Sequence, residues 1–189
     1  MRELDHLVVL ARTLDEGAAW IEARLGVVMA PGGKHDLMGT HNRLLSLGRG
    51  RYLEVMAIDP SAPPPARARW FELDTQETKQ RLAKGPALVH WAERTGDLEA
   101  EIAGYPEPLE IISFERGPFR WRMALRSDGL FPATGKMPTL IQWQGDLHPA
   151  DYLPASGCEM ENLDTAGGRL TATFRTPSGT RTISGPDPE

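Results

Sequence analysis

Four polar side chains interrupt short apolar stretches that are rich in residues favoured in β-strands: His6, Glu54, His90 and Gln142. A polar group inside a buried strand costs free energy unless it is hydrogen-bonded or faces a wet cavity. Two neutral imidazoles and a carboxylate form a donor set suited to Fe(II), Mn(II), Ni(II) or Zn(II), and an amide oxygen can add a weaker contact. Taken singly, each of these residues could equally be a satisfied structural group, for instance a histidine paired with Glu54. Together they indicate a ligand or metal site.

The two histidines stand at similar places in the sequence. His6 lies six residues before the stretch 12–15 (Arg-Thr-Leu-Asp), and His90 lies four residues before the similar stretch 94–97 (Arg-Thr-Gly-Asp). Strand side chains alternate with a period of two, so this even offset keeps both histidines on the same face. The spacing therefore predicts that His6 and His90 occupy equivalent positions in two copies of one unit.

The elements around these residues follow the same order twice. The first copy predicts a strand, a helix that ends at Gly26, and two or three further strands, with residues 48–51 as a hairpin turn. The second copy predicts a strand, a short helix and three strands. The expected ranges are 4–10, 13–26, 42–47 and 52–58 in the first copy, and 87–92, 97–103, 110–115, 119–125 and 139–143 in the second.

Proline-rich residues separate the copies, and a further segment follows the second. The prolines at 60, 63, 64 and 65 predict an extended connector, followed by a helix over 70–84. After residue 145, the stretches 169–174 and 180–183 predict a β-hairpin. We expect one structural domain made of four segments: 1–59 (first module), 60–86 (connector and helix), 87–145 (second module) and 146–189 (C-terminal extension).

Several of these motifs resemble one known superfamily. Residues 4–8 are similar to the opening strand, and 52–55 to the closing strand, of a module in the vicinal oxygen chelate superfamily. Residues 39–45, 138–143 and 148–149 resemble its glyoxalase-like branch, and the resemblance extends over residues 4–145. It implies an α+β fold in which two βαβββ modules form an incomplete curved barrel with helices outside. A homodimer is a reasonable expectation from the same resemblance.

The resemblance also implies a site. Metal ligands in that superfamily come from the first and last strands of the paired modules, which match His6, Glu54, His90 and Gln142. An amide at position 142 would hold a divalent ion less tightly than the carboxylate common in the family. The leading hypothesis is a metal-assisted enzyme of the lyase, isomerase or dioxygenase type acting on a small oxygenated molecule. The alternative is a metal-independent protein that binds or sequesters a small molecule, as bleomycin-resistance proteins do. A degenerate member that acts through dimer contacts is a third option.

Five further residues are candidates for substrate contact: His41, Trp91, Arg120, Arg122 and Trp143. His41 reaches a ligand only if the loop that carries it folds over the concave side of the curved barrel, which we call the cup. Otherwise His41 could be solvated. The two arginines alternate with apolar neighbours, so they either point into the cup and bind an anionic group or lie in solvent. The two tryptophans could be pocket wall or core.

Composition limits the partners. The net charge is -5, which gives no reason to expect nucleic acid or an anionic membrane, and no apolar stretch has the length of a membrane span. No phosphate-binding glycine loop is present, so no nucleotide cofactor is expected. Cys158 is the only cysteine, which excludes an internal disulfide and a thiolate metal site. These features favour a cytoplasmic protein with a small-molecule ligand.

Overall fold

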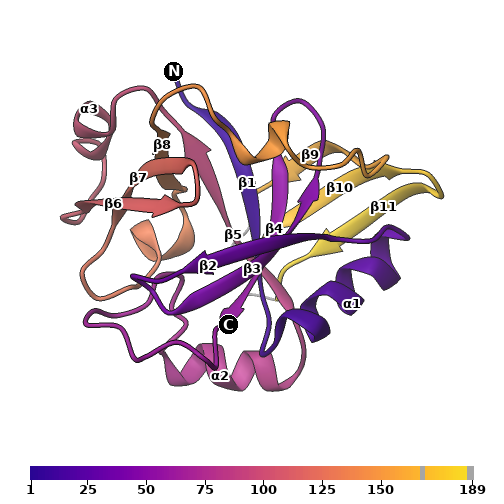
Figure 1. Ribbon diagram of the computed structural model, residues 1–189, viewed down its shortest axis with the longest axis horizontal. Coiled ribbons are helices and arrows are strands. Elements are labelled where there is room, and N and C mark those ends of the chain that lie inside the picture. Colours follow the sequence, from indigo (N-terminus) through magenta and orange to yellow (C-terminus); the bar gives the residue numbers. More distant parts are fainter. Residues whose placement is uncertain (167–168, 187–189) are drawn as a thin grey trace.

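The computed structural model describes residues 1–166 and 169–186, and Figure 1 shows two sheets with helices on their outer sides. Within these ranges no helix is long and apolar enough to cross a bilayer. The elements of the first block are β1 (Glu3–Leu10), α1 (Leu14–Leu25), β2 (Ala30–His35), β3 (Thr40–Ser46) and β4 (Tyr52–Ile58). After α2 (Gln76–Ala83), the second block has β5 (Ala87–Arg94), α3 (Leu98–Ile102), β6 (Glu110–Arg116), β7 (Phe119–Leu125), the short 3₁₀ turn η1 (Pro132–Gly135) and β8 (Thr139–Trp143). The extension has η2 (Pro149–Asp151), β9 (Glu159–Asp164), β10 (Thr171–Thr176) and β11 (Gly179–Ser184).

The larger sheet joins the two blocks. Its eight strands run in the order β2-β3-β4-β1-β5-β8-β7-β6, so each block supplies four neighbouring strands. Strands β1 and β5 pair antiparallel at the centre, and each pairs parallel with the last strand of its own block. The sheet curls until its two edge strands, β2 and β6, contact each other. The α+β fold and the doubled βαβββ order expected from the sequence are confirmed.

Alternation along the strands divides the core. From β1, Leu7 and Val9 point to the convex face, where they pack with α1 and the smaller sheet. Val8 and Leu10 point to the concave face, which is filled largely by aromatic side chains from the connector and from β6 and β7. The concave face therefore carries an apolar lining into which a few polar groups project.

Helix α1 begins and ends as its sequence predicts. The Thr13 side chain accepts a hydrogen bond from the Glu16 backbone N–H at the N-terminus, and Gly26 ends the helix in the left-handed region at φ 71°. Gly17 lies against Val55 of β4, where a Cβ would overlap the valine side chain. This close approach seats the helix on the convex face.

The connector helix is shorter than the range 70–84 predicted for it. Helix α2 covers only Gln76–Ala83, with Thr75 as its N-cap. Phe71 and Glu72 have φ of 57° and 58°, a left-handed conformation that cannot continue a right-handed helix. The residues before Thr75 instead form turns that place two aromatic rings in the cup.

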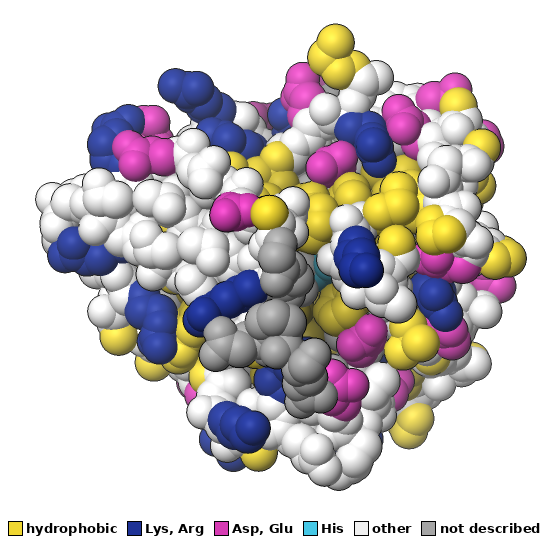
Figure 2. All heavy atoms as spheres, turned by 180° about the vertical axis from the view of Figure 1, so that it is seen from behind, with side chains coloured by type: hydrophobic (Ala, Val, Ile, Leu, Met, Phe, Trp, Pro, Cys, Tyr) yellow, Lys and Arg dark blue, Asp and Glu magenta, His cyan; other side chains and the backbone are white. Residues whose placement is uncertain are grey.

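The extension forms a sheet of its own. The predicted hairpin is present as β10 and β11, and β9, which was not predicted, pairs with the other side of β10. The Phe174 side chain from β10 is fully buried in the same cluster as α1. On the face seen in Figure 2, acidic and basic side chains are interspersed and form no continuous basic patch.

Candidate active site in the cup

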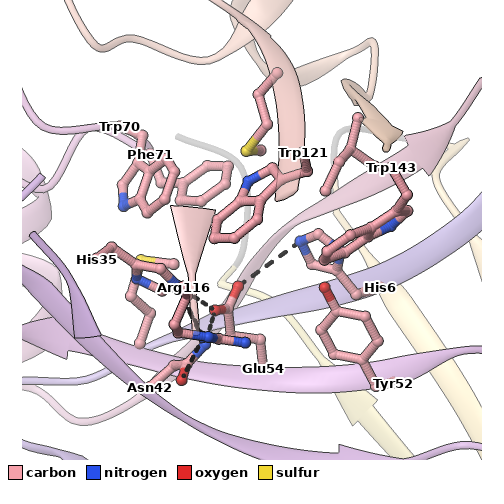
Figure 3. A pocket seen from close by; sticks show the side chains of 13 residues that line it. His6, His35, Asn42, Tyr52, Glu54, Trp70, Phe71, Arg116, Trp121 and Trp143 are labelled. Atoms are coloured by element: carbon pink, nitrogen blue, oxygen red, sulfur yellow. Dashed lines mark hydrogen bonds and ion pairs between the residues drawn. The ribbon is translucent and has the colours of Figure 1, made fainter. Parts of the chain in front are cut away.

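A small cavity lies on the concave face of the large sheet (Figure 3). Its polar wall comes from β1 to β4 and from Arg116 at the end of β6, and its apolar wall comes mainly from aromatic rings of the connector, β7 and β8. The cavity offers about 20 Å³ to the centres of water molecules, which is room for one or two waters. A ligand larger than water therefore has to displace some of this lining.

His6 and Glu54 meet at the floor of the cavity. Parallel pairing of β1 with β4 sets Tyr52 beside His6 and Glu54 beside Val8, so all three side chains share the concave face. The His6 Nε2 atom lies 3.7 Å from Glu54 Oε2, and the Tyr52 ring stacks on the imidazole at 4.7 Å between centroids. Two of the four predicted ligands are thus brought together.

A β-bulge adds Asp5 to this pair. Leu4 pairs with Glu93 and His6 with Ala92, so Asp5 is an extra residue in β1. A bulge turns a side chain away from the face that strict alternation gives it. The Asp5 carboxylate is fully buried and lies 2.7 Å from the Nδ1 atom of its neighbour His6.

Two further groups donate to the same carboxylate. The Trp143 indole N–H and His148 Nε2 each lie 3.0 Å from Asp5 Oδ2. His148 Nδ1 accepts a hydrogen bond from the backbone N–H of Ala150, so the proton of the neutral ring is on Nε2 and is donated to Asp5. Asp5 is therefore saturated by donors from β1, from β8 and from the loop after β8.

This network shifts the pKa values of its members. Burial alone would raise the pKa of Asp5, but hydrogen bonds from His148 and His6 outweigh it and hold that pKa below its usual range. Burial would lower the pKa of His6, yet the hydrogen bond and charge of Asp5 raise it above the ordinary value. Burial raises the pKa of Tyr52 well above its usual range, so its phenol stays protonated. The cavity floor thus holds an ionised Asp5 whose partner His6 gains affinity for a proton.

A second polar group covers the other side of Glu54. Asn42 donates its amide N–H to Glu54 Oε1, and its own oxygen accepts from the backbone N–H of Gly33. The Arg116 guanidinium donates to the same Asn42 oxygen at 3.2 Å and approaches His35 Nε2 at 3.2 Å. Glu54 is thus fixed in place from both sides.

The glycine pair in β2 makes room for this arrangement. A Cβ at Gly33 would lie 2.5 Å from Arg116 Cδ, and a Cβ at Gly32 would overlap Asn42. Burial and the nearby Arg116 charge lower the pKa of His35 well below its ordinary value, so that ring is neutral and can accept the arginine hydrogen bond. Arg116 forms no ion pair within 4 Å with a carboxylate of residues 1–166 or 169–186.

The second block places its equivalent residues differently. His90, like His6, is the fourth residue of an eight-residue strand. Val8 pairs with Glu54 in the first block, and Ala92, the equivalent of Val8, pairs with Thr139 in the second. Thr139 therefore occupies the position that Glu54 has in the first block, and the structure does not give this place to Gln142.

His90 is bonded to that threonine. Its Nε2 atom lies 3.1 Å from both the Thr139 backbone N–H and the Thr139 hydroxyl. Burial lowers the pKa of His90 to about 3, so the ring is neutral. Its Nδ1 atom has no hydrogen-bond partner among the described residues, which costs about 1–3 kcal/mol for a buried donor.

Three other predicted residues lie outside the cup. Gln142 faces α3 on the convex side, where it accepts from Arg122 and donates to the Gly96 carbonyl. Arg122 also pairs with Glu99 of α3, and Arg120 pairs with Glu115 near the β6–β7 turn. In β7 the arginines alternate with apolar residues, and two of these, Trp121 and Met123, line the cavity. Alternation therefore turns the arginines to the opposite, outer face of the strand.

The remaining candidates for substrate contact lie in different places. Trp143 lines the cavity and bonds to Asp5, as described above. Trp91 packs on the convex face and donates its indole N–H to Glu93. His41 is half-buried on β3 and, because its neighbour Asn42 faces the cavity, points to the other side; burial lowers its pKa. The structure thus brings only Trp143 of these to the cavity.

The donor groups do not fit a divalent metal. In the described part of the chain, no three His, Cys, Asp or Glu side chains converge as a metal site would require. The His90 Nε2 lone pair is occupied by the Thr139 N–H, and His6 Nδ1 is held by Asp5. The His35 Nε2 atom also lies 3.8 Å from Glu54 Oε1, but it is occupied by the Arg116 N–H. Of the described residues, His6 Nε2 and Glu54 are left facing a common space, which is fewer than the three or more protein ligands of catalytic zinc sites.

Sequence reasoning missed several residues that line or support the cavity. Asp5 was overlooked because strict alternation places it opposite His6, although an Asp-His dipeptide inside an apolar strand could have drawn attention. The pair Gly32-Gly33 within a strand was a usable signal of close backbone approach. His35 lies between the predicted elements 13–26 and 42–47, where no strand was expected, and nothing local to Arg116 indicates its role.

Comparison with known proteins identifies the family of the chain. The model of the family described as "Glyoxalase-like domain" matches residues 4–176. The chain belongs to this family. It is thereby placed in the vicinal oxygen chelate superfamily, as its motifs predicted. No protein with a curated description matches the sequence.

Among solved structures, a hypothetical protein from Staphylococcus aureus is 14% identical, with a TM-score of 0.59, over 100% of this chain and 87% of that one. A hypothetical protein from Bacillus halodurans C-125 is 13% identical, with a TM-score of 0.50, over 78% and 96%. A methylmalonyl-CoA epimerase from Mycobacterium tuberculosis is 20% identical over 74% and 85%, with a TM-score of 0.45. At these identities the first two show a shared fold and leave the substrate open.

Proposed function

We propose that this glyoxalase-like protein is an enzyme of the isomerase type that moves a proton on a small carbonyl compound without the help of a metal. The observation that carries the proposal is the chain of contacts from Asp5 through His6 to Glu54 at the floor of an aromatic-lined cavity. A buried carboxylate that orients a histidine, with a second carboxyl group opposite, is an arrangement typical of acid–base catalysis.

The chemistry needs no oxidant and leaves the proton count unchanged. The Glu54 side chain acts as a carboxylate and accepts the proton from the carbon next to the carbonyl, and the electron pair of the broken C–H bond moves toward the carbonyl oxygen to give an enolate. His6 acts as the imidazolium, which the raised pKa favours: its Nδ1–H stays on Asp5 and it donates its Nε2 proton to the enolate oxygen. Return of the Glu54 proton to the same carbon, with loss of the enol O–H proton to His6, completes an exchange. In a hydroxyketone, delivery of the Glu54 proton to the neighbouring carbon, with loss of that carbon's O–H proton to His6, completes an isomerisation.

Sequestration of a small molecule is the second candidate. Its support is the number of aromatic rings in the cup, with Trp70, Phe71, Trp121 and Trp143 all lining the cavity (Figure 3). Such rings bind flat apolar molecules without any need for catalysis. The homodimer and the cytoplasmic location expected from the sequence stay predictions.

Hydrogen exchange from carbon distinguishes the two candidates. In D₂O, the protein should speed the loss of the α-proton signal of at least one compound in a panel of 2-oxo acids, hydroxyketones and aryl alkyl ketones followed by ¹H NMR. The variant His6→Gln should lose this acceleration about 100-fold or more, whereas His41→Gln, whose ring points away from the cavity, should keep it.

Dialysis against a chelator should leave the exchange rate unchanged if no metal takes part. Binding of panel members, seen as quenching of tryptophan fluorescence, without any acceleration of exchange would favour sequestration. Exchange that chelation abolishes and added Mn²⁺ or Zn²⁺ restores would show the proposed mechanism to be wrong.

A further inference from the structure

The fully buried His90 presents a hydrogen-bond donor that the structure leaves unused. Its Nε2 atom accepts from the Thr139 backbone N–H at 3.1 Å, so the proton of the neutral ring resides on Nδ1. That Nδ1–H has no acceptor among the described residues, although the ring is 0% exposed. Buried donors in proteins are almost always paired, so an unpaired one inside the cup points to a missing acceptor.

The rings around His90 define what that acceptor can be. Phe131 and Phe71 lie 4.6 Å and 5.9 Å from the imidazole between centroids. The Thr139 partner stays neutral, and the histidine itself stays neutral because burial lowers its pKa to about 3. An apolar, uncharged setting favours a neutral oxygen on a flat molecule over a charged carboxylate.

The Phe71 ring lies 5.9 Å from the His90 imidazole between centroids and also lines the cavity above Glu54. Trp70 and Phe71 line the cavity above Glu54, which has a volume of about 20 Å³. They also line a second cavity of about 10 Å³, which Thr139 lines as well. Neither space admits more than one or two waters. Because the Phe71 ring lines both, its removal would join them and uncover the adjacent His90 imidazole.

The backbone that carries the Phe71 ring is suited to movement. Phe71 and Glu72 are consecutive non-glycine residues with φ of 57° and 58°, which is an unfavourable conformation for both. The segment is attached to the loop before η1 through the Glu72 N–H to the Gly129 carbonyl and through the Glu72 carboxylate to the Phe131 N–H. These two hydrogen bonds are the ones that have to break for Glu72 to move away from that loop.

We infer that His90 is a substrate-binding residue whose Nδ1–H donates to the carbonyl oxygen of an aryl ketone or aldehyde, and that the Phe71 ring occupies the place of the ligand until it binds. The inference rests on the proposed function for the carbonyl class of ligand, and it extends the site across both modules. The donor would polarise the same carbonyl whose neighbouring C–H bond is broken at Glu54.

Acetophenone and ethylbenzene are matched probes, because they have nearly the same shape and only the ketone accepts a hydrogen bond. Affinities are measured by tryptophan fluorescence on the wild-type protein and on Phe71→Ala. We expect Phe71→Ala to bind both probes at least tenfold more tightly, and acetophenone about three- to tenfold more tightly than ethylbenzene. In the double variant Phe71→Ala/His90→Leu that preference for the ketone should vanish. Phe119→Ala, which shortens an aromatic side chain outside both cavities, is the control and should change neither affinity.

Side-chain ¹⁵N NMR of the wild-type protein tests the donor without any substitution. His90 should show the Nδ1–H tautomer, and saturating acetophenone should shift that proton downfield. A Nε2–H tautomer, or equal affinity for the two probes in Phe71→Ala with and without His90, would overturn the inference. None of these readouts requires turnover, so loss of hydrogen exchange alone would count against the proposed reaction and leave the binding role of His90 standing.

Discussion

Replacing Asp5 by asparagine should damage both the stability of the fold and the proton chemistry of His6. The carboxylate accepts three hydrogen bonds, from His6, Trp143 and His148, and none of its surface reaches solvent. Asparagine has nearly the same shape but only one accepting oxygen. Because that oxygen is best placed toward the two donors Trp143 and His148, its NH₂ group would face His6 Nδ1.

The cost can be worked out from the three bonds. A hydrogen bond to a charged group contributes about 1.5–3 kcal/mol, and a neutral one about 0.5–1.5 kcal/mol. Loss of the charge therefore weakens each bond by about 1 kcal/mol. For the three bonds together, Asp5→Asn lowers the free energy of unfolding by about 3 kcal/mol. In addition, His6 would have to accept at Nδ1, so its ring could carry a proton on Nε2 only, whereas Asp5 in the wild type stabilises a ring that is protonated on both nitrogens. An inverted tautomer of this kind in a catalytic histidine lowers kcat about 10⁴-fold in serine proteases.

The effect should depend on pH with a definite sign. The pKa of His6 is raised above 6.5, so the stability gained from its proton is fully present below pH 6.5 and is lost as pH rises through the folded value. The pKa of Asp5 is lowered from 3.8, so its contribution is present above pH 3.8 and is lost as pH falls through the folded value. The difference between wild type and Asp5→Asn should thus be largest between about pH 4 and 6.5 and should shrink at alkaline pH.

Urea unfolding from pH 4.5 to 9 measures this difference, and side-chain ¹⁵N NMR reads the His6 tautomer. Asp15→Asn is the matched control, because it makes the same change in a carboxylate that also has a charge partner, Arg43, but is 87% exposed; it should change the free energy of unfolding by less than about 1 kcal/mol. If Asp5→Asn unfolds like Asp15→Asn at every pH, or keeps the wild-type tautomer of His6, the reasoning about the buried network is refuted.

Two further substitutions test other parts of the structure. Gly33→Ala should destabilise the protein by about 1–3 kcal/mol and displace Arg116, because the new Cβ would lie 2.5 Å from Arg116 Cδ; an unchanged thermal unfolding midpoint and an unchanged Arg116 side-chain signal in NMR would contradict the close approach. Phe174→Ala should lower the free energy of unfolding by about 3–5 kcal/mol, since its side chain is fully buried between the extension and α1; a loss below 1 kcal/mol in urea unfolding would mean that the smaller sheet does not share the core.

The sequence predicted the repeated strand and helix order because the periodicity and turn residues of each block are local signals. It also placed His6 and Glu54 together, since both are polar residues in the interior of central strands. Gln142 was misplaced because the face of a strand residue depends on register: the pairing of Ala92 with Thr139 cannot be read from hydrophobic pattern alone. A one-residue difference in such a pairing turns every side chain to the other face.

The site residues that the sequence did not predict were missed for a different reason. Asp5 reaches the cup through a bulge, and Arg116 reaches it because the two edges of the curled sheet meet. Both depend on contacts between residues far apart in sequence. The shortened α2 was decided by the left-handed pair Phe71 and Glu72, whose conformation opposes their own helix propensity and is imposed by tertiary packing.

The contact between His148 and Asp5 has a consequence for how the protein could be divided. His148 lies beyond both βαβββ modules, at the N-terminus of η2, yet it donates to the carboxylate that controls His6. A shortened chain ending at Trp143 would contain the whole repeat and still lack one of the three donors that keep Asp5 ionised. The smallest segment that can carry the proposed chemistry is therefore larger than the duplicated unit.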